Sequence, residues 1–278
     1  MWTPLSNFTA IHWDDPIEIA IFLAGTSFSI ISLVANRVNV PFLHREGGLM
    51  TYSKFATNVE FGISISSKWG MALLYWPSVL LGTYFLHQSG SSMNNILHDP
   101  RALAATLMIF HFGKRTIECL FLHKYSGKMP LSSSLFITSV YLFVSFGVCY
   151  CSAKQHSDSF SEAGHVRMRY IGLGFFLMGQ MGNFYHHLLL ASLRKPGDKA
   201  YKVPSGGLFE YVAAPHYLFE IISWIGVTLV CQHVLLTLAV LGMAIYLSDR
   251  AVSQSKWNRE NLKGKYPAHR KHLVPFLF

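Results

Sequence analysis

A short connection between two apolar stretches concentrates positive charge. It reads LRKPGDKAYKVPSGGLF, residues 193–209, and Arg194 and Lys202 stand near Tyr201 among its four basic residues. Arginine binds phosphate through a planar bidentate fork, and lysine binds it as a point charge. A basic connection of this kind either fixes the orientation of a membrane protein or binds a polyanion.

Polar side chains at helical spacing lie on both sides of this connection. Before it, Asn183 and His187 are four residues apart. After it, His216, Glu220 and Trp224 follow one another at the same spacing. Residues four apart share one face of a helix, so each segment presents a polar stripe next to the basic connection.

A third segment, HFGKRTIECLFLH, places ionisable residues inside an apolar run. Lys114 and Glu118 are four residues apart, and we expect them to form an ion pair on one helix face. Arg115 points about a hundred degrees away from Lys114 and needs a partner of its own. Charged groups at membrane depth are costly, which makes all three functional candidates.

Composition indicates that these segments lie in a bilayer. The chain has 278 residues, of which 51% are hydrophobic and 13% charged, and its mean hydropathy is +0.31. A soluble domain usually carries about 25% charged residues. The net charge of +9 is divided into short clusters between apolar segments, which argues against a nucleic-acid partner. We expect a single integral domain over residues 1–278, in contact with membrane lipids.

Seven stretches are long and apolar enough to cross as helices, each needing about 20 residues. They cover residues 17–36, 69–88, 102–123, 131–152, 169–192, 208–230 and 233–249. We therefore predict an all-α integral membrane protein, a seven-transmembrane helical bundle with a kink at Pro215. A lumenal N-terminus and a cytosolic C-terminus put most loop lysines and arginines on the inner side, as the positive-inside rule requires.

The histidine spacing does not predict a metal site. Membrane di-iron enzymes need several histidine clusters, whereas only His186 and His187 are adjacent here and neither has a second histidine three or four residues away. The four cysteines also lack metal-ligand spacing. On the predicted topology Cys149, Cys151 and Cys231 fall near the lumenal side, so both free thiols and a bridge remain open.

The glycines of the fifth stretch do not form a nucleotide fingerprint. Gly172, Gly174 and Gly179 match GxGxxG only loosely, and they lie in an apolar run. Small residues in such a run favour close packing between helices. Any dinucleotide would have to bind through charge and hydrogen bonds from helix ends and loops.

Four motifs occur in order along the chain: HFGKRTIECLFLHKYSGKMP, LRKPGDKAYKVPSGGLFEYV, APHYLFEIISWIG and KYPAHRKHLVPFLF. Together they resemble the membrane steroid 5α-reductase family, which includes very-long-chain trans-2-enoyl-CoA reductases and polyprenal reductases. The similarity covers roughly residues 105–278, with a thinner match near 68–79. It implies a seven-helix, multi-pass enzyme of the endoplasmic reticulum membrane. Such an enzyme uses cytosolic NADPH to reduce a carbon–carbon double bond conjugated to a carbonyl.

The resemblance also implies a cofactor site. The NADPH phosphates would be bound by Arg194, Tyr201, Lys202 and Arg250. Further residues expected along the cofactor are Asn183, His187, His216, Tyr217 and Asn258. Three of these depart from the family pattern: the steroid enzymes usually have an acid at the position of His187, often Asn at His216, and usually Tyr at Asn258.

The chemistry requires a hydrogen-bond donor at the substrate carbonyl, where enolate charge develops. In the steroid-reducing members a Glu of the second span and a Tyr of the third hold that oxygen, and this chain resembles them with Tyr75 and Phe112 in those places. Tyr75 can donate through its phenol, His111 can assist, and Tyr217 is a further candidate, whereas Phe112 cannot donate. The residues expected to contact the substrate are Tyr75, Phe112, Arg115, Glu220 and Trp224.

Three function classes remain open. The favoured one is an NADPH-dependent reductase of a lipid substrate, a steroid or sterol enone ahead of a very-long-chain trans-2-enoyl-CoA. A membrane methyltransferase of the kind that acts on prenylated cysteine has a similar C-terminal helical arrangement, but its cofactor has no phosphate to meet the cations. A non-enzymatic sterol-binding protein would be compatible with the changes at Tyr75 and Phe112.

Overall fold

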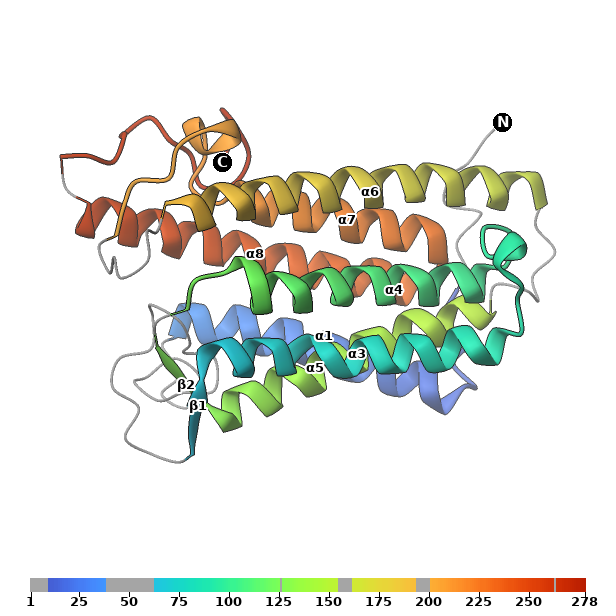
Figure 1. Ribbon diagram of the computed structural model, residues 1–278. Coiled ribbons are helices and arrows are strands. Elements are labelled where there is room, and N and C mark those ends of the chain that lie inside the picture. The colour runs from blue at the N-terminus through green and yellow to red at the C-terminus, as the bar shows by residue number, and fades with distance from the viewer. Residues whose placement is uncertain (1–9, 39–62, 126, 155–161, 194–200, 263) are drawn as a thin grey trace.

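The protein folds as a bundle of long helices. The computed structural model describes residues 10–38, 63–125, 127–154, 162–193, 201–262 and 264–278, and within them seven α-helices lie lengthwise beside one another (Figure 1). The helices are α1 (Pro16–Val38), α3 (Ser67–Ser89), α4 (Pro100–Ile117), α5 (Leu131–Lys154), α6 (Glu162–Ser192), α7 (Pro215–Cys231) and α8 (Val234–Asn261). Successive helices run in alternating directions, so α1 begins and α8 ends at opposite ends of the bundle (Figure 1).

Each predicted stretch coincides with one helix, but three boundaries move. Helix α6 begins earlier than expected, at Glu162, and α8 continues to Asn261. Helix α7 begins later, at Pro215, which occupies the first turn of the helix. Proline fits there because its missing N–H would have no partner within the helix anyway. The predicted kink at Pro215 is therefore wrong.

Two of the described helices, α5 and α8, are long and apolar enough to cross a membrane by length and composition. The Pro16–Ser27 part of α1 and the whole of α7 are apolar but shorter. Helices α4 and α6 carry ionisable side chains, which lower their mean hydropathy. Polar residues are thus gathered on particular helices of an otherwise apolar bundle.

Helices α6 and α7 touch at the backbone. A methyl group added to Gly179 would lie 2.4 Å from the backbone nitrogen of Ser223, and one added to Gly226 would lie 2.4 Å from that of Phe176. Real Cβ atoms do not approach other atoms so closely. The expectation that glycines of this stretch serve helix packing is confirmed for Gly172 and Gly179 but not for Gly174, and the contact fixes how the polar stripes of α6 and α7 face each other.

A few short elements lie outside the long helices. Strands β1 (Ser64–Ser66) and β2 (Lys128–Pro130) pair antiparallel, and this ribbon departs from the all-helical prediction. Helix α4 ends in a π-helical turn, Glu118–Leu122, closed by a 2.8 Å hydrogen bond from the His123 amide to the Glu118 carbonyl. Turns of this type are frequent at functional sites.

The C-terminal tail fastens the segment that follows α6. Arg270 donates from Nη1 to the carbonyl of Pro204 at 2.6 Å and from Nη2 to the Glu210 carboxylate at 3.2 Å. The backbone of Lys271 bonds Tyr211 and Ala213 at 2.8 and 2.9 Å. Tail and segment therefore gather at the end of the bundle where α6 and α8 finish (Figure 1).

The opposite end of the bundle contains buried thiols and is joined by an ion pair. Cys149, Cys151 and Cys231 are buried free thiols, as is Cys119 near the other end, so no bridge forms. Lys154 and Tyr150 of α5 donate to the Asp15 carboxylate at 2.6 and 2.8 Å. These hydrogen bonds hold the pKa of Asp15 well below its ordinary value.

We expect Gly179→Ala to separate α6 from α7, because its methyl group has backbone atoms in its way. Overpacking of this kind costs about 1–3 kcal/mol or more. The midpoint of thermal unfolding in detergent should fall. Gly174→Ala is the matched control on the same helix, since its methyl group would meet nothing within 4 Å. Equal midpoints for the two variants would contradict the close contact.

Candidate active site

A cavity of about 410 Å³ lies where α3 to α8 meet the segment after α6, with Tyr141 as the contribution of α5. This volume falls within the range of about 300–1,000 Å³ that is usual for small-molecule sites. Most site residues predicted from the sequence line it: Tyr75, His111, Arg115, Asn183, His187, Tyr201, Lys202, His216, Tyr217, Glu220, Arg250 and Asn258. The fold thus brings together residues from five helices and one connection.

Three predicted residues do not appear in this lining. Arg194 lies outside the described residues. Phe112 and Trp224 are buried behind the cavity wall, with Phe112 fully inaccessible. The Phe112 ring centre is 6.2 Å from that of Tyr75, and the Trp224 ring centre is 5.1 Å from that of His111. Both rings therefore support lining residues from behind.

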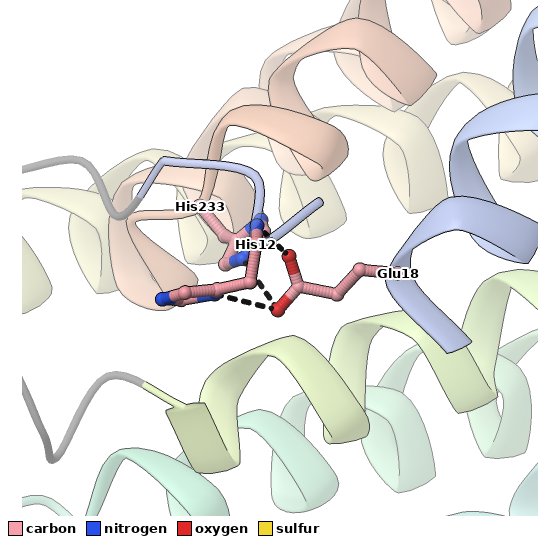
Figure 2. Close-up of side chains that lie close together, drawn as sticks. All are labelled: His12, Glu18 and His233. Atoms are coloured by element: carbon pink, nitrogen blue, oxygen red, sulfur yellow. Dashed lines mark hydrogen bonds and ion pairs between the residues drawn. The ribbon is translucent and has the colours of Figure 1, made fainter. Parts of the chain in front are cut away.

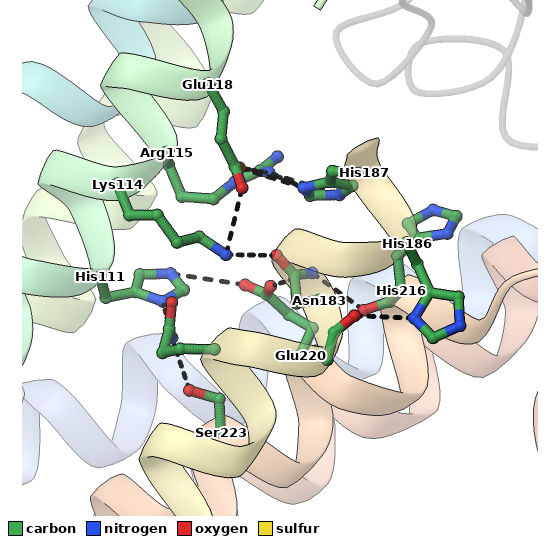
Figure 3. A network of polar contacts seen from close by, with 12 residues as sticks. His111, Lys114, Arg115, Glu118, Asn183, His186, His187, His216, Glu220 and Ser223 are labelled. Atoms are coloured by element: carbon green, nitrogen blue, oxygen red, sulfur yellow. Dashed lines mark hydrogen bonds and ion pairs between the residues drawn. The ribbon is translucent and has the colours of Figure 1, made fainter. Parts of the chain in front are cut away.

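A buried carboxylate organises the charges on α4 (Figure 3). Glu118 is 1% exposed, and its two oxygens lie 3.3 Å from Lys114 Nζ and 2.5 Å from Arg115 Nη1. The pairing of Lys114 with Glu118 is confirmed. His187 of α6 approaches the same group, with Nδ1 at 3.0 Å from Glu118 Oε2 and 2.9 Å from Arg115 Nη1. One acid thus holds two cations and a ring from another helix.

The same cations reach the other helices of the site. Arg115 donates from Nη2 to the Tyr75 hydroxyl oxygen at 3.2 Å, and its guanidinium carbon lies 5.1 Å from the centre of the Tyr75 ring. Lys114 donates to the Asn183 side-chain oxygen at 2.5 Å. Arg115 therefore donates to a lone pair of the Tyr75 oxygen and places a positive charge beside the phenol. This contact polarises the phenol of a residue that lines the cavity.

The polar stripes of α6 and α7 meet at Asn183. Its amide nitrogen donates to the backbone carbonyl of His216 and to Glu220 Oε2, both at 3.0 Å. Glu220 Oε1 accepts from the Trp224 indole at 3.4 Å and lies 3.4 Å from His111 Nε2. Glu220 is thus surrounded by donors from three helices, as Figure 3 shows for Asn183 and His111.

Two buried residues beyond the predicted set position His111. Gln180 lies 2.8 Å from His111 Nδ1 through its side-chain nitrogen, and the same nitrogen donates to the Ser223 hydroxyl at 2.6 Å. Gln180 precedes Asn183 by one helical turn, and Ser223 follows Glu220 by one turn. Continuing the polar stripes by a further turn in each direction would have found both.

The far end of the cavity is lined by α8 and the basic connection. Lys202 and Tyr201 lie there with Arg250. The Tyr201 ring centre is 4.6 Å from that of Trp257 on α8. The additional lining residues of this helix are Tyr246, Leu247, Gln254 and Trp257. Tyr246, Gln254 and Asn258 are four or eight residues from Arg250. Helical spacing from Arg250 therefore predicts that they line the same cavity.

Glu118, His123 and His187 come close enough together to offer ligand atoms within 4.8 Å of one another. The histidine spacing could not show this group, because its members come from the π-helical turn after α4 and from α6. The Arg115 guanidinium already occupies this place, lying 2.5 Å from Glu118 and 2.9 Å from His187. A cation there would face a fixed positive charge, so this group is better suited to holding Arg115 than a metal.

Comparison with known proteins connects this site to one family. The family model described as 3-oxo-5-alpha-steroid 4-dehydrogenase matches residues 128–278. The chain belongs to this family. It is 30% identical to 3-oxo-5-alpha-steroid 4-dehydrogenase 1 of Macaca fascicularis over 82% of this chain and 85% of the relative. The family predicted from the four motifs is therefore confirmed.

Other relatives in the 3-oxo-5-alpha-steroid 4-dehydrogenase family differ in their named substrates. Steroid 5-alpha-reductase DET2 of Solanum lycopersicum is 29% identical over 82% of this chain and 87% of its own length. Very-long-chain enoyl-CoA reductase of Dictyostelium discoideum is 31% identical over 70% of this chain and 67% of its own length. The family's enzymes are oxidoreductases that act on CH–CH groups.

We expect Glu118→Gln to destabilise the protein strongly, because it leaves Lys114 and Arg115 buried without a compensating charge. Breaking a buried ion pair on one side costs about 3–5 kcal/mol. Thermal unfolding in detergent measures the effect. Glu260→Gln, at an exposed position of α8, is the matched control and should change the midpoint little. An unchanged midpoint for Glu118→Gln would show that the network does not stabilise the fold.

Proposed function

We propose that this protein is an NADPH-dependent reductase of a carbon–carbon double bond conjugated to a carbonyl, acting on a lipid-soluble substrate. A steroid or sterol enone is the favoured substrate. The observation that carries the proposal is one cavity lined both by a polarised phenol, Tyr75, and by the cations Lys202 and Arg250. Membership of a family of CH–CH oxidoreductases supports the reaction class.

The donor set at the far end of the cavity fits a phosphorylated dinucleotide. Lys202 and Arg250 suit phosphate oxygens, and Tyr201 and Asn258 add hydrogen-bonding groups beside them. Asn183, His187, His216 and Tyr217 continue this wall toward α3 and α4 and would hold the rest of the cofactor. Arg194 is proposed from the sequence as a further phosphate ligand. A bound reduced nicotinamide would supply the hydride that adds to the β-carbon of the substrate.

Tyr75 would donate its phenol hydrogen to the substrate carbonyl oxygen. Negative charge grows on this oxygen as the double bond is reduced, and a donor already in place stabilises it. Arg115 strengthens Tyr75 as a donor because its positive charge lies 3.2 Å from the phenol oxygen, and Glu118 holds Arg115 in that position. Tyr75 is 5% exposed, so little water weakens these interactions.

The α-carbon must also gain a proton to complete the reduction. His111 and Tyr217 are protic groups that line the cavity beside Tyr75 and along the cofactor wall. His111 is held between Gln180 and Glu220, at 2.8 and 3.4 Å. We assign His111 to assist Tyr75 at the substrate carbonyl, and we place Tyr217 beside the cofactor. Substrate contacts would come from Tyr75, Arg115 and Glu220, with Phe112 and Trp224 supporting them from behind.

The same proposal includes the membrane arrangement: one integral domain of seven transmembrane helices in the endoplasmic reticulum, with a lumenal N-terminus and a cytosolic C-terminus. Seven helices of alternating direction support it (Figure 1). The basic connection, the tail and the loop before α5 share one end of the bundle. That end would face the cytosol, where NADPH is available, while the substrate enters from lipid.

A very-long-chain trans-2-enoyl-CoA is the second candidate substrate, because the Dictyostelium discoideum relative bears that activity in its name. A coenzyme A thioester carries its own phosphates, so its affinity would fall with salt, unlike that of a steroid. Consumption of NADPH with steroid enones, polyprenals and enoyl thioesters distinguishes the candidates. Binding of S-adenosylmethionine without binding of NADPH would contradict the reductase proposal and favour a methyltransferase.

We expect Tyr75→Phe to lower kcat by about 10²-fold or more, as loss of a donor to a developing oxyanion does. NADPH affinity should stay near that of the wild type, because Tyr75 is not among the proposed phosphate ligands, Lys202 and Arg250. Steady-state turnover and fluorescence titration measure the two quantities. Tyr84→Phe is the control, since Tyr84 lies on the same helix and is 56% exposed. Undiminished turnover in Tyr75→Phe would remove this residue from the mechanism.

Lys202→Ala and Arg250→Ala should each weaken NADPH binding at least about tenfold, because a hydrogen bond to a charged group contributes about 1.5–3 kcal/mol. NADPH fluorescence in detergent reports the dissociation constant. Lys256→Ala removes an exposed cation from the same helix as Arg250 and should have no effect. If all three variants bind NADPH equally well, the phosphate assignment fails.

A further inference from the structure

A second group of polar residues, drawn in Figure 2, lies at the end of the bundle where α1 and α8 begin (Figure 1). His12 precedes α1, Glu18 is in its first turn, and His233 lies between α7 and α8. Glu18 and His233 are fully buried, whereas the His12 side chain is 37% exposed. Three segments that are distant in sequence therefore bring two imidazoles to one carboxylate.

The spacing of the ligand atoms fits a small tetrahedral ion. Glu18 Oε1 lies 3.0 Å from His12 Nδ1 and 3.5 Å from His233 Nε2, and one ligand atom from each residue lies within 4.8 Å of the others. A tetrahedral Zn²⁺ with ligands at about 2.0–2.2 Å keeps neighbouring ligand atoms about 3.3–3.6 Å apart. Two of the three separations thus lie close to those of a zinc site, and the third is within 4.8 Å.

Within the described residues, no lysine or arginine pairs with Glu18, and its close neighbours of opposite polarity are the two histidine rings. Lys154 instead binds Asp15, at 2.6 Å. The Nε2 atom of His233 is buried and makes no hydrogen bond. This is the opposite of the Glu118 group, where Arg115 supplies the positive charge.

The carboxylate is oriented for binding. The His12 backbone amide donates to Glu18 Oε2 at 2.7 Å, which leaves Oε1 directed at the two rings. On His233 the Leu235 amide approaches Nδ1 at 3.3 Å, a long hydrogen bond. Coordination through Nε2 moves the ring proton to Nδ1, so this weak contact breaks when an ion binds.

We propose that His12, Glu18 and His233 form a site for a divalent transition metal ion, Zn²⁺ foremost. Imidazole and carboxylate ligands suit this ion, and the exposed side of His12 gives it a path of entry. Three protein ligands leave the fourth position to water. The ion ties the chain before α1 to the start of α8, and so joins the first and last helices of the bundle.

Zinc titration of the purified full-length protein tests the site. After treatment with a chelator, the wild type should bind one Zn²⁺ per chain in detergent and unfold at a higher temperature with Zn²⁺ than without. Co²⁺ in place of Zn²⁺ should give the visible absorption of a tetrahedral complex. His12→Ala should weaken Zn²⁺ binding at least about tenfold and abolish the thermal shift.

The choice of variants keeps folding and binding separate. His12 is partly exposed, so its removal costs little packing, and Glu18→Gln keeps the side-chain volume and the hydrogen bond to the His12 amide. His98→Ala is the matched control, because His98 is an exposed histidine at the same end of the bundle. The site does not exist if the wild type binds no Zn²⁺, or if His12→Ala binds it as tightly as His98→Ala.

Discussion

The arrangement of this protein depends on the neutralisation of charge inside an apolar bundle. Two cations of α4, Lys114 and Arg115, share the carboxylate of Glu118. One acid cannot satisfy every donor of both cations, and the remaining donors find oxygens on other helices, those of Asn183 and Tyr75. Because an unsatisfied charge in a low-dielectric interior is costly, this requirement sets the positions of α3, α4 and α6 together.

The sequence was sufficient for the long helices and for most of the predicted residues that line the cavity, but not for the contacts between them. Hydropathy located seven helices, since a long apolar run must form its backbone hydrogen bonds within itself in lipid. The pairing of Lys114 with Glu118 followed from helical spacing alone. The contacts of Lys114 with Asn183 and of Gln180 with His111 join residues 69 positions apart. They depend on the rotation of each helix about its axis, which no local pattern contains.

The start of α7 shows how a local rule can point to the wrong structure. Proline inside a helix breaks it, and Pro215 lies within a continuous apolar stretch, so a kink was expected. The residues before it instead form a short turn, Gly207–Glu210, and a bridge to Lys271 of the tail. The tail lies far away in sequence and supplies the hydrogen bonds that allow the helix to begin at the proline.

The glycine contact between α6 and α7 determines which wall of the cavity can move. The backbones of α6 and α7 touch at Gly172, Gly179 and Gly226 and leave no layer of side chains between them that could deform. The two helices therefore behave as one rigid unit. This unit holds four residues of the cavity wall in fixed relative positions: Asn183, His187, His216 and Glu220. A motion that admits a bulky substrate must therefore occur at another wall of the cavity, where α8 contributes side chains such as Tyr246 and Trp257.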